Sequence, residues 1–188
     1  MKEPEEYRFL AKKEWPLGAD GIPTRQAARV IIISEDGYAL LMLGHDSNDV
    51  NYRWWFTVGG GIKAGETALE AAQRELLEET GYEAKPHEVV GPVVERDGLF
   101  KFVDRPRRQI EYMFLVRTER FEVDSSRWTT SEKSLIDDLR WVPISEIEEL
   151  SKEAFIYPPE LTEIISTLYS NRWDGECVKI DEYNENGA

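Results

Sequence analysis

The sequence predicts one domain of the α/β (α+β) class. Apolar residues make up 41% of the 188 residues, a share that supports an ordinary buried core. Strand-like apolar runs occur between residues 27 and 144, and helical periodicity occurs at 67–80 and again near the C-terminus. Three glycines at 59–61 join one strand-like run to the first helix. A strand, a glycine turn and a helix in this order indicate a functional site at the turn.

The first part of the chain is expected to form an extension, a hairpin and a third strand. Prolines interrupt residues 1–23 and prevent a long element there. Strands at 27–33 and 38–43 are joined by an Asp-Gly turn, which is typical of β-hairpins. Polar residues at 44–52 predict a loop, and the aromatic and apolar run at 54–58 predicts a buried strand.

The helix at 67–80 has good helix formers and no proline, and Gly81 stands where a left-handed C-terminal cap falls. Further strands are expected at 89–95, 99–103, 110–118 and 140–144, with an arginine-rich turn at 105–108 and a polar loop at 125–134. A short helix begins at Ser145, and Pro159 opens a helix to about Asn171. Its apolar face is Leu161, Ile164, Ile165 and Leu168, and a mobile acidic tail is expected after Asp174.

Composition argues against several classes of protein. A net charge of −14 is the wrong balance for gripping a long nucleic acid, although a few arginines and metal ions still permit a short nucleotide. No apolar run approaches the roughly 18 residues of a membrane span, and the acidic N-terminus is unlike a secretory signal. Cys177 is the single cysteine in the sequence, which favours a reducing compartment. We therefore expect a cytoplasmic protein without a membrane partner.

Carboxylates are concentrated on the helix at 67–80. Glu75, Glu78 and Glu79 are three or four positions apart and therefore share one face. Like charges packed together repel, and a hard divalent cation with oxygen ligands removes that cost. An acidic face in contact with solvent is the alternative, but the glycine run directly before the helix favours a metal-bound phosphate site.

Residues 60–82 resemble the Nudix box, G-x5-E-x7-R-E-U-x-E-E-x-G-U, in which U is a bulky apolar residue. The fixed positions are occupied by Gly60, Glu66, Arg74, Glu75, Leu76, Glu78, Glu79 and Gly81, and Tyr82 departs mildly from the usual aliphatic residue. Eight fixed positions at fixed spacing make a specific signal. The strand pattern extends the resemblance over 24–150, with 1–23 as an N-terminal extension and 151–188 as a C-terminal helix and acidic tail packing on the same domain.

The resemblance implies a Nudix hydrolase. Its fold would be an α/β/α sandwich with a mixed central sheet, and its reaction would cleave a diphosphate bond in a nucleoside di- or triphosphate or in a nucleoside diphosphate conjugate. It also implies that Glu75, Glu78, Glu79 and the Gly59 carbonyl hold Mg²⁺, or alternatively Mn²⁺, with Gly60, Glu66 and Arg74 in support. From the helix alone, Arg74 is expected to point away from the acidic face and to pair with Glu66 or Glu70.

The proton acceptor is left open. It could be a box glutamate, Glu78 or Glu79, or a carboxylate elsewhere in the chain. Glu132 lies in the polar loop that often carries an extra glutamate in relatives, and Glu111 lies on an expected strand. Either of these two could instead be an ordinary carboxylate in contact with solvent.

Arginines and aromatic side chains are candidates for substrate contacts. Arg29 stands in an apolar strand, where a charge needs a partner or a ligand. Arg25, Arg29 and Arg53 could bind phosphates, and a ring from the run at 54–56 could stack on a base. A surface position for the arginines and core packing for the rings are the alternatives.

Subfamily marks outside the box leave the substrate open. Arg96 and Asp97 stand where ADP-ribose pyrophosphatases often have a proline, and Leu99 and Phe100 stand where diadenosine polyphosphate hydrolases often have a tyrosine. The upstream coenzyme A signature is not visible. The partner is therefore expected to be a small-molecule nucleotide, without any narrower class.

Two other functions are alternatives to hydrolysis. An isoprenoid diphosphate isomerase would need a cysteine in the core, whereas Cys177 lies in the tail. A non-catalytic nucleotide sensor or interaction module is the main alternative, although such modules often lose box glutamates that this chain keeps. The segment around Trp15 and the C-terminal helix could also serve a homodimer.

Overall fold

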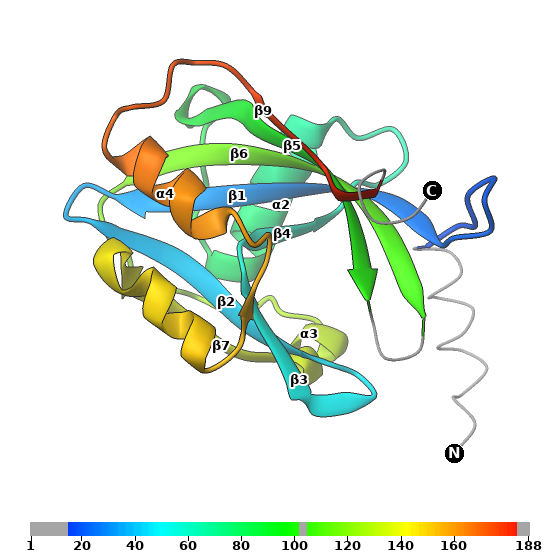
Figure 1. Ribbon diagram of the computed structural model, residues 1–188. Helices are drawn as coiled ribbons and strands as arrows, with labels where there is room; N and C mark the ends of the chain where they lie inside the picture. The colour runs from blue at the N-terminus through cyan, green and yellow to red at the C-terminus, as the bar shows by residue number, and fades with distance from the viewer. Residues whose placement is uncertain (1–14, 102–104, 184–188) are drawn as a thin grey trace.

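A nine-stranded mixed sheet dominates residues 15–101 and 105–183, the part of the chain that the computed structural model describes (Figure 1). Its strand order is β8 (Phe155–Ile156), β3 (Asp49–Phe56), β2 (Tyr38–Asp46), β1 (Thr24–Ser34), β6 (Pro106–Thr118), β5 (Val89–Lys101) and β9 (Val178–Asp181), while β4 (Val58–Gly61) pairs with β1 and β7 (Ile136–Pro143) pairs with β2. The pairs β1–β6, β3–β8 and β5–β9 are parallel and the other pairs are antiparallel, so the sheet is mixed.

Helices cover both faces of the sheet, which gives three layers (Figure 1). Alternate residues of β1 enter two separate cores: Val30 and Ile32 pack with α2 (Ala68–Thr80), whereas Ile31 and Ile33 pack with α4 (Leu161–Tyr169) and the 3₁₀ helix η2 (Ile144–Lys152). This is the period of two expected for a strand buried on both faces. The predicted α/β/α sandwich with a mixed central sheet is confirmed.

The helix α2 begins and ends where its sequence predicts. Thr67 caps the N-terminus through a capping box, in which its hydroxyl accepts from the Glu70 N–H at 3.2 Å and the Glu70 carboxylate accepts from the Thr67 N–H at 2.8 Å. Gly81 ends the helix with φ of 78°, and its N–H donates to the Leu77 carbonyl at 3.0 Å. These caps hold the carboxylate-bearing helix in a fixed position beside β4.

Several stretches expected to be loops belong to strands or helices. Most of 44–52 forms the paired ends of β2 and β3. The expected strands 89–95 and 99–103 join into β5, with 102–103 outside the described residues, and most of the turn at 105–108 belongs to β6. The loop at 125–134 contains α3 (Thr130–Leu135). Ladder hydrogen bonds to a neighbouring strand, rather than apolar side chains, hold these polar strand segments, and such partners are invisible in the sequence.

The remaining boundaries shift modestly. The expected strand 54–58 divides into the end of β3 and the start of β4, and the helix expected from Ser145 is the 3₁₀ helix η2. The apolar face of α4 is buried as predicted, by Leu161, Ile164, Ile165 and Leu168. The tail was expected to lack regular structure, but residues 178–181 form β9 on the edge of β5. Residues 1–14 and 184–188 of the expected extension and tail lie outside the described residues.

Within the described ranges, every helix is too short or too polar to cross a lipid bilayer.

Candidate active site

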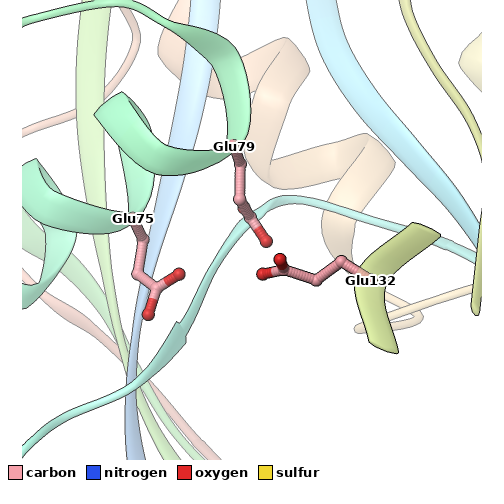
Figure 2. Close-up of side chains that lie close together, drawn as sticks. All are labelled: Glu75, Glu79 and Glu132. Atoms are coloured by element: carbon pink, nitrogen blue, oxygen red, sulfur yellow. The ribbon is translucent and has the colours of Figure 1, made fainter. Parts of the chain in front are cut away.

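Three carboxylates from two helices converge beside the glycines of β4. Glu75 and Glu79 of α2 approach Glu132 of α3, and one oxygen of each lies within 4.8 Å of the other two (Figure 2). Figure 2 shows the Glu79 and Glu132 side chains pointing toward each other from their two helices, with Glu75 one helical turn away. The spacing of the box places the first two on one face, whereas only the tertiary fold brings Glu132 to them.

Burial makes this cluster costly without a cation. Glu75 and Glu79 are only 7% and 5% exposed. Burial, and then the negative charge of Glu75, raises the pKa of Glu79, while burial raises the pKa of Glu75 against the opposing charge of Arg74. Converging carboxylate oxygens are the donor set that a hard divalent cation prefers. The residues present therefore fit Mg²⁺ or Mn²⁺.

The glycines at 59–61, expected to form a turn, instead lie in strand β4, and they are needed there because the chain passes too close to its neighbours for a side chain. At Gly59, with φ of 134°, a Cβ would lie 2.2 Å from the Ala28 carbonyl oxygen on β1. At Gly60 a Cβ would lie 2.7 Å from a Glu75 carboxylate oxygen. The Gly59 N–H donates to Glu79 at 2.7 Å. The two glycines thus let β4 lie between β1 and the carboxylates of α2.

Arg74 joins α2 to Glu66 and to the end of β4. Its guanidinium donates to Glu66 through two hydrogen bonds of 2.7 and 2.9 Å and to the Gly61 carbonyl at 3.0 Å. It also donates to Glu75 at 2.5 Å and to Glu78 at 3.3 Å. The expectation that Arg74 points away from the acidic face is wrong, because its long side chain runs back along that face and neutralises it.

Glu78 occupies a different position from the other two box carboxylates. Its side chain is 43% exposed, it lies 4.0 Å from the Lys63 ammonium, and it is outside the group of three converging carboxylates among the described residues. Glu70, the other predicted partner of Arg74, is instead engaged in the N-terminal cap of α2.

Glu111 on β6 is buried between two arginines. It accepts from Arg29 Nε at 3.2 Å and from Arg96 Nη1 at 2.7 Å. Burial acts to raise the pKa of Glu111, but the two guanidinium charges outweigh it and the net shift is downward. A lowered pKa makes a weak proton acceptor, which counts against Glu111 as the base. Arg29 also donates to the Gly59 and Thr57 carbonyls, so the carbonyl that the resemblance assigned to the metal is hydrogen-bonded to an arginine.

The cluster opens into a cavity of about 460 Å³. Its cationic lining residues are Arg25, Arg29, Lys63, Arg74, Arg96 and Arg107, and its aromatic ones are Trp15, Trp54, Phe56, Phe100 and Tyr157. Glu78 and Glu111 also border it. Cations, rings and carboxylates around one hollow are suited to an anionic ligand with a flat group.

Two of the candidate substrate-binding residues, Arg53 and Trp55, do not line this cavity. Arg53 lies outside the lining, with its Nε 3.3 Å from an Asp137 carboxylate oxygen. Trp55 is fully buried in the core, whereas its neighbours Trp54 and Phe56 border the cavity. Strand alternation explains the difference, because residues 54 and 56 face the side opposite to residue 55.

Arg96, Gln109 and Tyr157 border the cavity although sequence reasoning did not select them. Arg96 is the strand partner of Glu111, and Gln109 is the strand partner of Arg25 and accepts from its Nε at 2.6 Å. Gln109 and Glu111 stand at alternate positions of a largely apolar strand, and this is the kind of signal that selected Arg29. Arg96 lies in the charged run 95–97 and Tyr157 lies outside the strands, so no comparable signal marked them.

The chain is similar to known proteins in family, sequence and structure. The family model described as NUDIX domain matches residues 23–163. The chain is 23% identical over 148 residues to the RNA pyrophosphohydrolase of Bartonella bacilliformis, covering 69% of this chain and 83% of the relative. It is 26% identical over 150 residues to the RNA pyrophosphohydrolase of Bartonella henselae, covering 69% and 82%.

Solved structures share the fold at low identity. A MutT NUDIX hydrolase from Burkholderia pseudomallei superposes with a TM-score of 0.55 and 16% identity, covering 74% of this chain and 95% of that one. An Ap4A hydrolase from C. elegans gives a TM-score of 0.53 and 14% identity, covering 78% and 98%. Both likenesses concern the arrangement of the sheet and helices.

Proposed function

The chain belongs to the NUDIX domain family, and from this premise we propose that it is a divalent-metal-dependent pyrophosphohydrolase acting on a nucleotide or a nucleotide conjugate. The observation that carries the proposal is the convergence of Glu75, Glu79 and Glu132 at the edge of a cavity that arginines and a lysine also line. The names of the two Bartonella relatives, both RNA pyrophosphohydrolases, support the same reaction.

The chain's own residues would hold Mg²⁺ or Mn²⁺ through Glu75 and Glu79, with Glu78 at the exposed side of the site and Glu132 beside them. When bound, the cation would neutralise charge on the diphosphate and favour ionisation of the attacking water. The Gly59 N–H donates to Glu79, and Arg74 joins Glu66 to the Gly61 carbonyl at the end of the same strand, β4. These contacts determine where the carboxylates point before any ligand arrives.

The cavity lining is balanced in charge, whereas the chain as a whole is strongly acidic: the basic residues Arg25, Arg29, Lys63, Arg74, Arg96 and Arg107 are matched by the acidic residues Asp46, Glu75, Glu78, Glu79, Glu111 and Glu132. Arg25 and Arg107 border the cavity and, with Lys63, offset the negative charge of phosphate groups. The net charge of −14 nevertheless opposes a long polyanion beyond the cavity. The substrate is therefore a small nucleotide or the end of a larger one rather than an extended strand.

Glu132 is the proton acceptor that we favour. It comes from α3, faces Glu79, and is more exposed than the two box glutamates of the cluster. A carboxylate near the reacting water but only partly buried can take up a proton and release it to solvent. Glu111, paired with two arginines, instead maintains the position of Arg29.

The test is Mg²⁺-dependent release of phosphate or pyrophosphate from nucleoside triphosphates, dinucleoside polyphosphates and a short RNA with a 5′-triphosphate. Glu79→Gln should lower turnover by roughly 100-fold or more, whereas Glu83→Gln, at an exposed position beyond α2, should leave it unchanged. Turnover that survives Glu79→Gln would remove the metal assignment. Nucleotide binding without turnover on any substrate would favour the non-catalytic sensor instead.

A further inference from the structure

The C-terminal strand brings a carboxylate to Arg96, a residue of the cavity lining, from outside the NUDIX match. That match ends at residue 163, and β9 runs parallel to β5 along Val94 to Asp97. Figure 1 shows β9 following the outer edge of β5. Glu182 directly follows this strand, and its placement depends on β9 rather than on the family domain.

Glu182 occupies one edge of the Arg96 guanidinium. Arg96 donates to it from Nε at 2.9 Å and from Nη2 at 2.7 Å, while Nη1 donates to Glu111. Arg96 borders the cavity and yet has no exposed side-chain surface, because the two carboxylates and Phe100 pack against it. Glu182 accepts hydrogen bonds from two parallel N–H groups on one edge of the guanidinium. Arginines bind phosphates through the same edge.

The charges around Arg96 cancel. Arg29 and Arg96 contribute two positive charges, and Glu111 and Glu182 contribute two negative ones, in one connected series of ion pairs. Removing the Glu182 charge would leave this buried group with one net positive charge. The C-terminal carboxylate therefore determines whether this end of the cavity is neutral or attracts an anion.

Two uncharged aromatic rings, Phe100 and Tyr157, border the cavity together with Arg96. Its guanidinium lies 4.7 Å from the centre of the Phe100 ring, and the Phe100 and Tyr157 rings are 5.6 Å apart. Burial and a hydrogen bond with Tyr52 raise the pKa of Tyr157, so its phenol stays neutral. Aromatic walls beside a neutralised arginine suit a planar uncharged group such as a nucleobase.

We propose that Glu182 is a specificity-determining residue: by neutralising Arg96, it reserves the Phe100–Tyr157 end of the cavity for a nucleobase and excludes a phosphate from it. This inference rests on the proposed function, because it presumes that a nucleotide enters the cavity with its diphosphate toward the carboxylates. The selectivity acts on binding, so it is measurable without catalysis.

The test compares two nucleotides that contain no diphosphate bond and cannot be turned over. Adenosine 5′-monophosphate and adenosine 2′,5′-bisphosphate differ by one phosphate on the ribose, near the base. Titration calorimetry with Mg²⁺ should show that the full-length protein binds the monophosphate more tightly, by roughly tenfold. Glu182→Gln removes the charge at nearly constant size and should abolish most of this preference by tightening the bisphosphate. Glu182→Ala, which also opens the edge of Arg96, should do so at least as strongly.

The matched control is Glu95→Gln. Glu95 pairs with Lys179 and so also ties β5 to β9, but both side chains are substantially exposed and neither borders the cavity. If Glu182 only anchored β9, both glutamine variants would change the melting temperature and neither would change the ratio of affinities. An unchanged ratio in Glu182→Gln, or a wild-type protein that binds neither compound, would overturn the inference. If the ratio of affinities shifts in Glu182→Gln but the wild-type protein hydrolyses no substrate, only the proposed catalysis is contradicted.

Discussion

Gly59→Ala tests the close approach of β4 to β1, on which the site depends. The new Cβ would lie 2.2 Å from the Ala28 carbonyl oxygen and 2.7 Å from Arg29 Cα, both backbone atoms that cannot rotate away. A non-glycine residue at such a φ costs about 1–3 kcal/mol. Separation of the strands would also lose one or two ladder hydrogen bonds of about 1 kcal/mol each. We expect the free energy of unfolding to fall by about 2–5 kcal/mol, a large mutational effect.

The assay is urea unfolding followed by tryptophan fluorescence, with Gly65→Ala as the matched control. Gly65 also has positive φ, 82°, but no atom lies within 4 Å of a Cβ built there, so only a conformational cost of about 1–2 kcal/mol remains. The difference between the two variants isolates the steric contact. Equal losses in both would refute the reasoning, since they would mean that β4 can move away from β1 without cost. Mg²⁺ binding should weaken in Gly59→Ala alone, because the Gly59 N–H positions Glu79.

Three further predictions concern single side chains. Hydrogen bonds from Arg74 lower the pKa of Glu66 below its ordinary value, so the ionised carboxylate stabilises the fold at neutral pH, and this contribution is lost as the pH falls through the lowered folded pKa. The difference in unfolding free energy between wild type and Glu66→Gln should therefore shrink on acidification. A difference that stays constant with pH would contradict the assignment. Arg74→Lys keeps the charge but loses the paired bonds to Glu66, and urea unfolding should show a loss of about 1.5–3 kcal/mol. Ile165→Ala removes a fully buried side chain of α4 and should lower the free energy of unfolding by about 2–5 kcal/mol. Glu163→Ala, at an exposed position of the same helix, should lower it little. Equal losses in the two variants would mean that α4 does not pack on the domain as described.

The box and the fold class could be predicted from the sequence because both depend on local periodicity. Positions 75 and 79 share a helix face at any location in a protein, since 3.6 residues make one turn. The unbroken apolar run at 30–33 likewise requires cover on both faces of β1. The extent of β5 and β6 could not be predicted in this way, because their polar ends depend on hydrogen bonds to one another.

The sequence by itself therefore determined the family, the acidic helix and its capping, and the need for glycine before it. Only the tertiary structure decided that Glu132 joins Glu75 and Glu79, that Arg53 pairs outside the cavity, and that Glu182 covers Arg96. The physical reason is that each of these contacts joins elements that are far apart in the sequence. Spacing along one helix is set by covalent geometry, whereas the meeting of distant side chains is set by how the whole core packs.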